Sequence, residues 1–151
     1  MTDTIARVSI VVPVRPDRAF AMFVGDIGRW WKKDTQHWLA PDIAIEMRIE
    51  PRVGGRMIEV HDAATGGGTA IGTVTAYEPG RRLAMTWRLP FWAAGADSDV
   101  EVVFTPAGAD ATRVEIIHDL ARAKLAPDRY ASYDRGWTVL LGYYSEHIAG
   151  T

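Results

Sequence analysis

Near its C-terminus the chain reads DRYASYDRGWTVLLGYYSEHI, from Asp128 to Ile148. Large apolar and aromatic residues recur there at intervals of three and four, at Tyr130, Tyr133, Trp137, Leu140, Leu141, Tyr144 and Ile148. This is the period of an α-helix, so the pattern predicts one long helix with a continuous aromatic stripe. A helix of about 20 residues is roughly 30 Å long, enough to cross a small domain.

Most of the chain before this helix alternates between apolar and polar residues, as β-strands do. The clearest case is the segment 43–50, where isoleucine or methionine stands at every second position from Ile43 to Ile49. Further strands are expected at residues 5–12, 56–61, 69–77, 83–89, 100–104 and 112–118. The connections after residue 50 are short and rich in glycine and proline, which predicts an antiparallel meander.

The order of these elements predicts the architecture. Pro16 suits the first turn of a helix, and apolar residues follow it at helical spacing, interrupted by Gly25 and Gly28. We therefore expect two short helices after the first strand. The fold class would be α+β, with a seven-stranded curved antiparallel sheet wrapped around the long C-terminal helix. Sheet curvature needs glycines or bulges, and the candidates are Gly54, Gly55 and Gly72.

Composition limits the classes of function. The chain has 151 residues, 48% of them hydrophobic and 24% charged, which is typical of one globular domain, so we expect residues 1–151 to form a single domain. Its net charge of −2 and the lack of a basic cluster argue against nucleic-acid or membrane-surface partners. There is no cysteine, which excludes disulfides and thiolate chemistry. The first residues lack a secretory signal pattern, and we expect a cytoplasmic monomer or small oligomer, including a homodimer.

Motifs for metals, cofactors and nucleophilic catalysis are missing. The histidines, which are His37, His61, His118 and His147, show no ligand-pair spacing, so no metal is expected. The glycine run at 66–68 lacks the Lys-Ser/Thr of a phosphate loop, and no serine elbow is present. We therefore expect no cofactor.

A set of short motifs spread along the chain resembles the START-like superfamily, also called SRPBCC or the helix-grip fold. The motifs are 16–20 (PDRAF) with Phe23, 28–31 (GRWW), 50–56 (EPRVGGR), 72–74 (GTV), 78–79 (EP), 83–87 (LAMTW), 102–106 (VVFTP), His118 and 136–137 (GW). Within the superfamily the chain is most similar to bacterial proteins that resemble the C-terminal domain of the activator of heat-shock protein 90 ATPase. The resemblance implies a deep cavity that relatives use to bind apolar small molecules, in some cases for cyclisation or dehydration. It supplies no universal catalytic set.

Alternation along the strands selects candidate residues for such a cavity. The expected ligand-binding residues are Trp31, Trp38, Met85, Trp87, Phe91, Trp92, Val102, His118, Tyr133, Trp137 and Leu141. His118 is either a histidine hydrogen-bonded to the neighbouring backbone, or a polar anchor or general acid/base in the cavity, where its ordinary pKa of roughly 6.5 would suit it to donate or accept a proton. His37 is a second polar candidate, although a histidine in a loop is more often exposed.

Two questions stay open in the sequence. Arg56 and Glu59 cannot share a face of one regular strand, and apolar residues on both sides of that segment do not decide which one points inward. A buried Glu59 would become an acid/base candidate. Phe91 and Trp92 lie in a turn between strands, where they would form a lid over the pocket, a contact with another subunit, or a local cluster at the rim.

Three hypotheses of function follow. The first is binding of a small apolar molecule, aromatic or polycyclic, in a cavity between the sheet and the C-terminal helix. The second is an enzyme of the cyclase or dehydratase type that uses His118 or Glu59 in the same cavity. The third is a protein-interaction role like that of the chaperone ATPase activator, ranked last because the sequence resembles only one domain of that protein.

Overall fold

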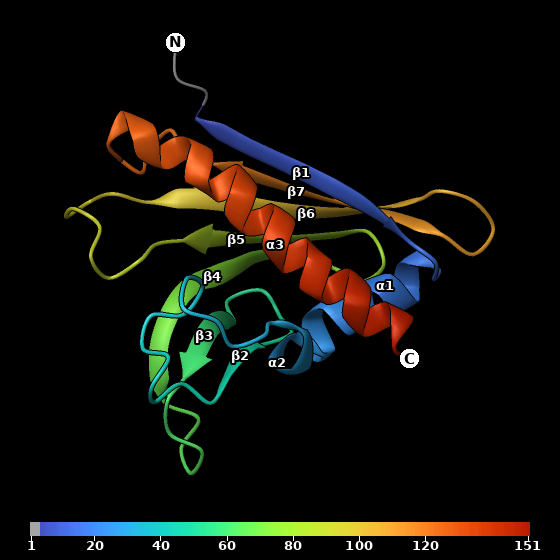
Figure 1. Ribbon diagram of the computed structural model, residues 1–151, viewed down its shortest axis with the longest axis horizontal. Helices are drawn as coiled ribbons and strands as arrows, with labels where there is room; N and C mark the ends of the chain where they lie inside the picture. Colours follow the sequence, from blue (N-terminus) through green and yellow to red (C-terminus); the bar gives the residue numbers. More distant parts are fainter. Residues whose placement is uncertain (1–3) are drawn as a thin grey trace.

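The computed structural model describes residues 4–151, so the start of the chain, where the signal pattern is missing, lies outside the described part. Seven antiparallel strands form one sheet in the order β1–β7–β6–β5–β4–β3–β2 (Figure 1). The strands are β1 (Ile5–Val12), β2 (Glu46–Ile49), β3 (Arg56–Val60), β4 (Gly68–Glu78), β5 (Arg82–Trp87), β6 (Ser98–Pro106) and β7 (Thr112–Asp119). The helices are α1 (Pro16–Gly25), α2 (Ile27–Trp30) and α3 (Tyr130–Ala149), preceded by the 3₁₀ turn η1 (Pro127–Arg129).

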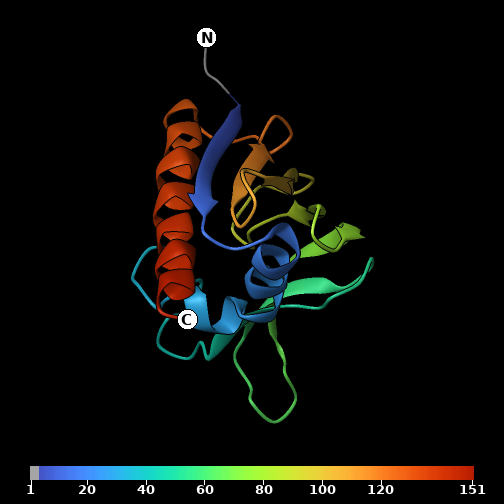
Figure 2. The same ribbon diagram turned by 90° about the vertical axis from the view of Figure 1, so that its right-hand side faces the viewer.

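The predicted α+β architecture is confirmed. The long helix α3 runs across one face of the curved sheet, and α1 and α2 close the end of the fold near the C-terminus (Figures 1 and 2). The C-terminal half of α3 is held on α1. The Tyr144 hydroxyl donates to the Ala19 carbonyl at 2.6 Å, and the Tyr144 ring packs edge to face against Phe23. None of the helices in residues 4–151 is both long and apolar enough to span a bilayer.

Curvature of the sheet is concentrated in β4. The pairing register shifts between Met57 and Ile58 on the β3 side and between Val74 and Ala76 on the β5 side, and such bulges bend a strand. Gly72 stands between these two irregularities. A Cβ at this position would lie 1.8 Å from the carbonyl oxygen of Thr86, so only glycine fits there.

The prediction of a strand over residues 43–50 is wrong for the first half of that segment. The Ala40 carbonyl accepts hydrogen bonds from the backbone N–H groups of Ile43 and Ala44, which makes a turn, and β2 begins only at Glu46. Ile43 and Ile45 are consequently 60% and 47% exposed instead of buried. The alternation was real in the sequence, but the turn after Pro41 removed these two residues from the core face.

The close approach at Gly72 gives a stability prediction. Gly72→Ala should lower the free energy of unfolding by more than about 2 kcal/mol, because the methyl group forces β4 away from Thr86. The matched control is Gly142→Ala in α3, where, apart from the adjoining helix backbone and chain neighbours, no described atom lies within 4 Å of the added Cβ. This control should raise stability by about 0.5–1 kcal/mol through helix propensity. Urea titrations followed by circular dichroism measure both, and equal stability of Gly72→Ala and wild type would contradict the account.

Candidate functional site

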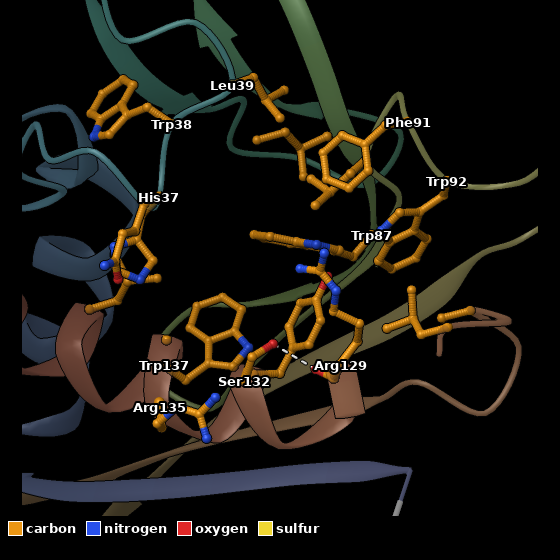
Figure 3. Close-up of a pocket in the computed structure, with 18 of the residues that line it drawn as sticks. His37, Trp38, Leu39, Trp87, Phe91, Trp92, Arg129, Ser132, Arg135 and Trp137 are labelled. Atoms are coloured by element: carbon orange, nitrogen blue, oxygen red, sulfur yellow. Dashed lines mark hydrogen bonds between the residues drawn. The ribbon is translucent and has the colours of Figure 1, made fainter. Parts of the chain in front are cut away.

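A cavity of about 940 Å³, partly open to solvent, lies beneath the N-terminal half of α3 (Figure 3). Its other walls come from the 31–45 loop between α2 and β2, the ends of β3, β4 and β5, the 88–97 loop, and the 120–126 segment before η1. The volume is at the upper end of the range for small-molecule sites, about 300–1,000 Å³. The hollow therefore occupies one end of the interface between helix and sheet, while Leu141 and Tyr144 are fully buried at the other end.

The predicted ligand-binding residues divide into two groups. Those that line the cavity are Trp31, Trp38, Trp87, Phe91, Trp92, Tyr133 and Trp137. Those that lie outside the lining are Met85, Val102, His118 and Leu141, all buried in the core. Strand alternation and, for Leu141, the helical period correctly placed this second group on buried positions, but none of the four reaches the lining. Trp87 and Trp137 both pack edge to face against His118.

His118 is part of a linear chain of hydrogen bonds that runs from Trp137 to the Trp87 carbonyl. The Trp137 indole N–H donates to its Nδ1 at 3.1 Å, so the neutral ring carries its proton on Nε2, which lies 2.8 Å from the Ser98 hydroxyl. That hydroxyl donates in turn to the Trp87 carbonyl at 2.7 Å. Burial lowers the pKa of His118 to about 3, so the ring is neutral near pH 7. Both ring nitrogens are engaged, which makes His118 a link between α3 and the sheet.

Glu59, not Arg56, points inward. Its carboxylate is fully buried at the cavity wall and accepts the backbone N–H groups of Leu39 at 2.6 Å and Ala40 at 2.9 Å. The His61 ring adds a third contact at 2.6 Å. Arg56 points to solvent, where it pairs with a different carboxylate. The oxygens of Glu59 are therefore used to fasten the 31–45 loop to the sheet.

His37 is better placed for chemistry than its position in a loop suggested. Its Nδ1 lies 2.6 Å from Asp34, whose carboxylate also accepts two backbone N–H groups of the same loop and the Tyr143 hydroxyl. Burial opposes the charge of Asp34, but the hydrogen bonds, led by that from His37, outweigh it and lower its pKa. His37 lines the cavity next to Gly136, and its Nε2 has no hydrogen-bond partner within residues 4–151.

Trp87 brings an unpaired donor to the aromatic wall. The ring stacks with Trp31 at 6.4 Å and meets Trp137 edge to face at 5.3 Å. Its indole N–H is buried and finds no acceptor in the part of the chain that the structure describes. A buried donor without a partner costs about 1–3 kcal/mol, so an acceptor from a water or a guest would stabilise this wall.

The 88–97 loop is held in place by Arg88, whose guanidinium donates to the carbonyls of Trp92, Ala93 and Ala96. Trp92 is buried by this arrangement and contacts the Tyr133 ring edge to face at 6.4 Å. Phe91 is 75% exposed at the mouth of the cavity. Trp92 is thus packed into the rim with one side on the cavity, whereas Phe91 is exposed to solvent at the mouth.

Positive charges at the cavity were missed at the sequence level. Lys124, Arg129 and Arg135 contribute to its lining, whereas Glu59 is the acidic residue in that lining. The segment from 121 to 127 carries no pattern that distinguishes it from an ordinary linker. Only the fold brings it opposite the 88–97 loop.

The burial of neutral His118 predicts a pH dependence of stability. In the unfolded chain His118 is protonated below its ordinary pKa of 6.5, whereas in the folded chain it stays neutral down to about pH 3. The unfolded state therefore binds more protons in this range, and the free energy of unfolding falls as the pH falls. Relative to a His118→Gln variant, wild type should lose about 1.5 kcal/mol of unfolding free energy between pH 6.5 and 5. The variant removes this one group and keeps the other histidines. Urea titrations across that window measure the difference, and parallel pH curves for the two proteins would refute the assignment.

Comparisons with known proteins agree with the fold and the motifs. The family model described as "Activator of Hsp90 ATPase homolog 1-like protein" matches residues 13–143. A curated relative, the Activator of 90 kDa heat shock protein ATPase homolog of Dictyostelium discoideum, is 31% identical over 71 residues. That match covers 47% of this chain but only 18% of the relative.

Two solved structures show the same fold. An anthrahydroquino-gamma-pyrone synthase is 30% identical, with a TM-score of 0.55 and 86% of each chain covered. An Aha1 dimer from Colwellia psychrerythraea is 14% identical, with a TM-score of 0.68 and coverage of 97% of this chain and 96% of the other. The resemblance seen in the short motifs is confirmed, and the chain belongs to the family of activator of Hsp90 ATPase homolog 1-like proteins.

Proposed function

We propose that the protein binds a small aromatic molecule in the cavity beneath α3. The observation that carries the proposal is the unpaired, buried indole N–H of Trp87 in a wall with many aromatic side chains. Ligand sites combine apolar walls with a few polar groups that fix orientation, and this cavity has that composition. The 30% identical synthase supports the proposal, since its name describes a product of fused aromatic rings.

Hydrogen bonds hold two loops of the cavity wall in place without a bound ligand. Glu59 holds the 31–45 loop through two backbone N–H groups, and Arg88 holds the 88–97 loop through three carbonyls. A preformed site loses less conformational entropy on binding than a flexible one. This supports binding of a rigid guest such as a fused ring system.

Catalysis in the same cavity is the second candidate, and the Asp34–His37 pair favours it. A carboxylate that orients one ring nitrogen while the other faces a cavity is the usual arrangement of a general base. His118 and Glu59 are weaker candidates, because their polar atoms are already occupied. A cyclisation or dehydration would then begin with proton removal by Nε2 of His37.

Action on a chaperone ATPase remains a third proposal, supported by the family and by exposed Phe91. The curated relative is matched over a small part of its length, so its activity is not carried over. A homodimer also remains a prediction, supported by the dimeric relative from Colwellia psychrerythraea. The cytoplasmic location and the single domain stay predictions from the sequence.

Fluorescence of N-phenyl-1-naphthylamine, which rises in apolar sites, tests the binding proposal. Wild type should bind this neutral aromatic probe saturably at one site. Gly136→Leu should weaken binding at least about tenfold, because the new side chain enters the space between α3 and His37.

The matched control is Gly142→Leu, which adds the same side chain to the same helix at a position with open space around it. Its affinity should equal that of wild type. Absence of binding by wild type, or equal binding by Gly136→Leu and wild type, would overturn the proposal.

A further inference from the structure

We infer that the guest of this cavity carries an acidic group at one end, and that the Arg129 guanidinium receives it. The inference rests on the proposed function and specifies the class of ligand: an aromatic body with one carboxylate, sulfonate or ionised phenol. It is carried by an excess of positive charge and of hydrogen-bond donors around the cavity.

The lining of the cavity carries more positive than negative side chains. Lys124, Arg129 and Arg135 are cations of the cavity wall. The acidic residue of the wall, Glu59, is buried and already accepts two backbone N–H groups and contacts His61. It is therefore not available to neutralise an arginine across the cavity.

The cations of the lining have no carboxylate partners among the described residues. Arginines on the strands generally have a carboxylate at hand; examples are Arg48 with Glu46, Arg56 with Glu50, Arg82 with Glu101 and Arg113 with Glu115. Within residues 4–151, by contrast, no ion pair includes Lys124, Arg129 or Arg135. Unpaired cations beside an apolar cavity leave a positive potential that attracts anions.

The two arginines of the lining point in different directions. In Figure 3 the Arg129 side chain extends from the start of α3 into the cavity on the side of Trp87, whereas the guanidinium of Arg135 points away. The Ser132 hydroxyl donates to the Arg129 carbonyl at 2.6 Å and so fixes the backbone of this turn. Arg129 is therefore better placed than Arg135 to reach a guest.

Neighbouring donors reinforce the same end of the cavity. Burial raises the pKa of Tyr133 to about 12, although a hydrogen bond with the Trp92 side chain and, to a smaller extent, the positive charge of Arg129 oppose this, so the hydroxyl remains protonated at neutral pH. The unpaired N–H of Trp87 is a further donor on the facing wall. A guanidinium, a phenol and an indole together offer donors to an anion, and arginine binds a carboxylate through two parallel hydrogen bonds.

Two probes that differ in a single acidic group test the inference. 8-Anilinonaphthalene-1-sulfonate and N-phenyl-1-naphthylamine share one aromatic body, and only the first carries a sulfonate. Arg129→Gln should weaken binding of the sulfonate probe about tenfold, the loss expected for one charge-assisted contact, and change binding of the neutral probe less than about twofold. Higher salt should weaken only the sulfonate probe in wild type.

The control is Arg18→Gln, which removes the same charge from an exposed position on α1, distant from the start of α3 (Figure 1). It should leave both affinities unchanged, and circular dichroism should show that both variants are folded. Equal losses in Arg18→Gln and Arg129→Gln, or no selective loss for the sulfonate probe, would overturn the inference. Binding of the neutral probe in that case would leave the proposed function standing, whereas failure of wild type to bind either probe would remove both.

Discussion

The hydrogen-bond chain from Trp137 through His118 and Ser98 to the Trp87 carbonyl joins the long helix to the sheet. Each link has one assignable direction, because an indole only donates and a carbonyl only accepts. The chain requires a neutral histidine, and burial among aromatic rings keeps the ring neutral by lowering its pKa. The helix is thereby fixed at Trp137, and its two halves meet different surroundings.

These two halves explain why the hollow lies where it does. Toward the C-terminus, the buried Tyr144 packs on α1, and its hydroxyl donates to the Ala19 carbonyl. Toward the N-terminus, Gly136 and Ser132 are too small to fill the space that the facing loops leave open. Those loops are held by Glu59 and Arg88, two charged residues whose partners within the loops are backbone groups. The cavity thus forms because these two loops are held in fixed positions opposite the small residues of α3.

Much of the fold could be predicted from periodicity, since α3, the seven strands and the paired short helices follow the helical and strand periods. The site could be predicted only in part. Alternation marks Met85 and Trp87 as equally inward, but it does not encode which one reaches the cavity and which one lies behind it. The roles of His37 and Arg129 depend on loops whose positions arise from tertiary contacts, and local sequence carries no record of those contacts.

A guest of this cavity must reach the wall at Trp87, and nuclear magnetic resonance of the tryptophan indole N–H groups tests this directly. Six tryptophans give separate signals. Titration with 8-anilinonaphthalene-1-sulfonate should shift the Trp87 signal strongly, while that of Trp30, bonded to the Phe23 carbonyl in the core, stays in place. An unchanged Trp87 signal at saturating probe would contradict the account.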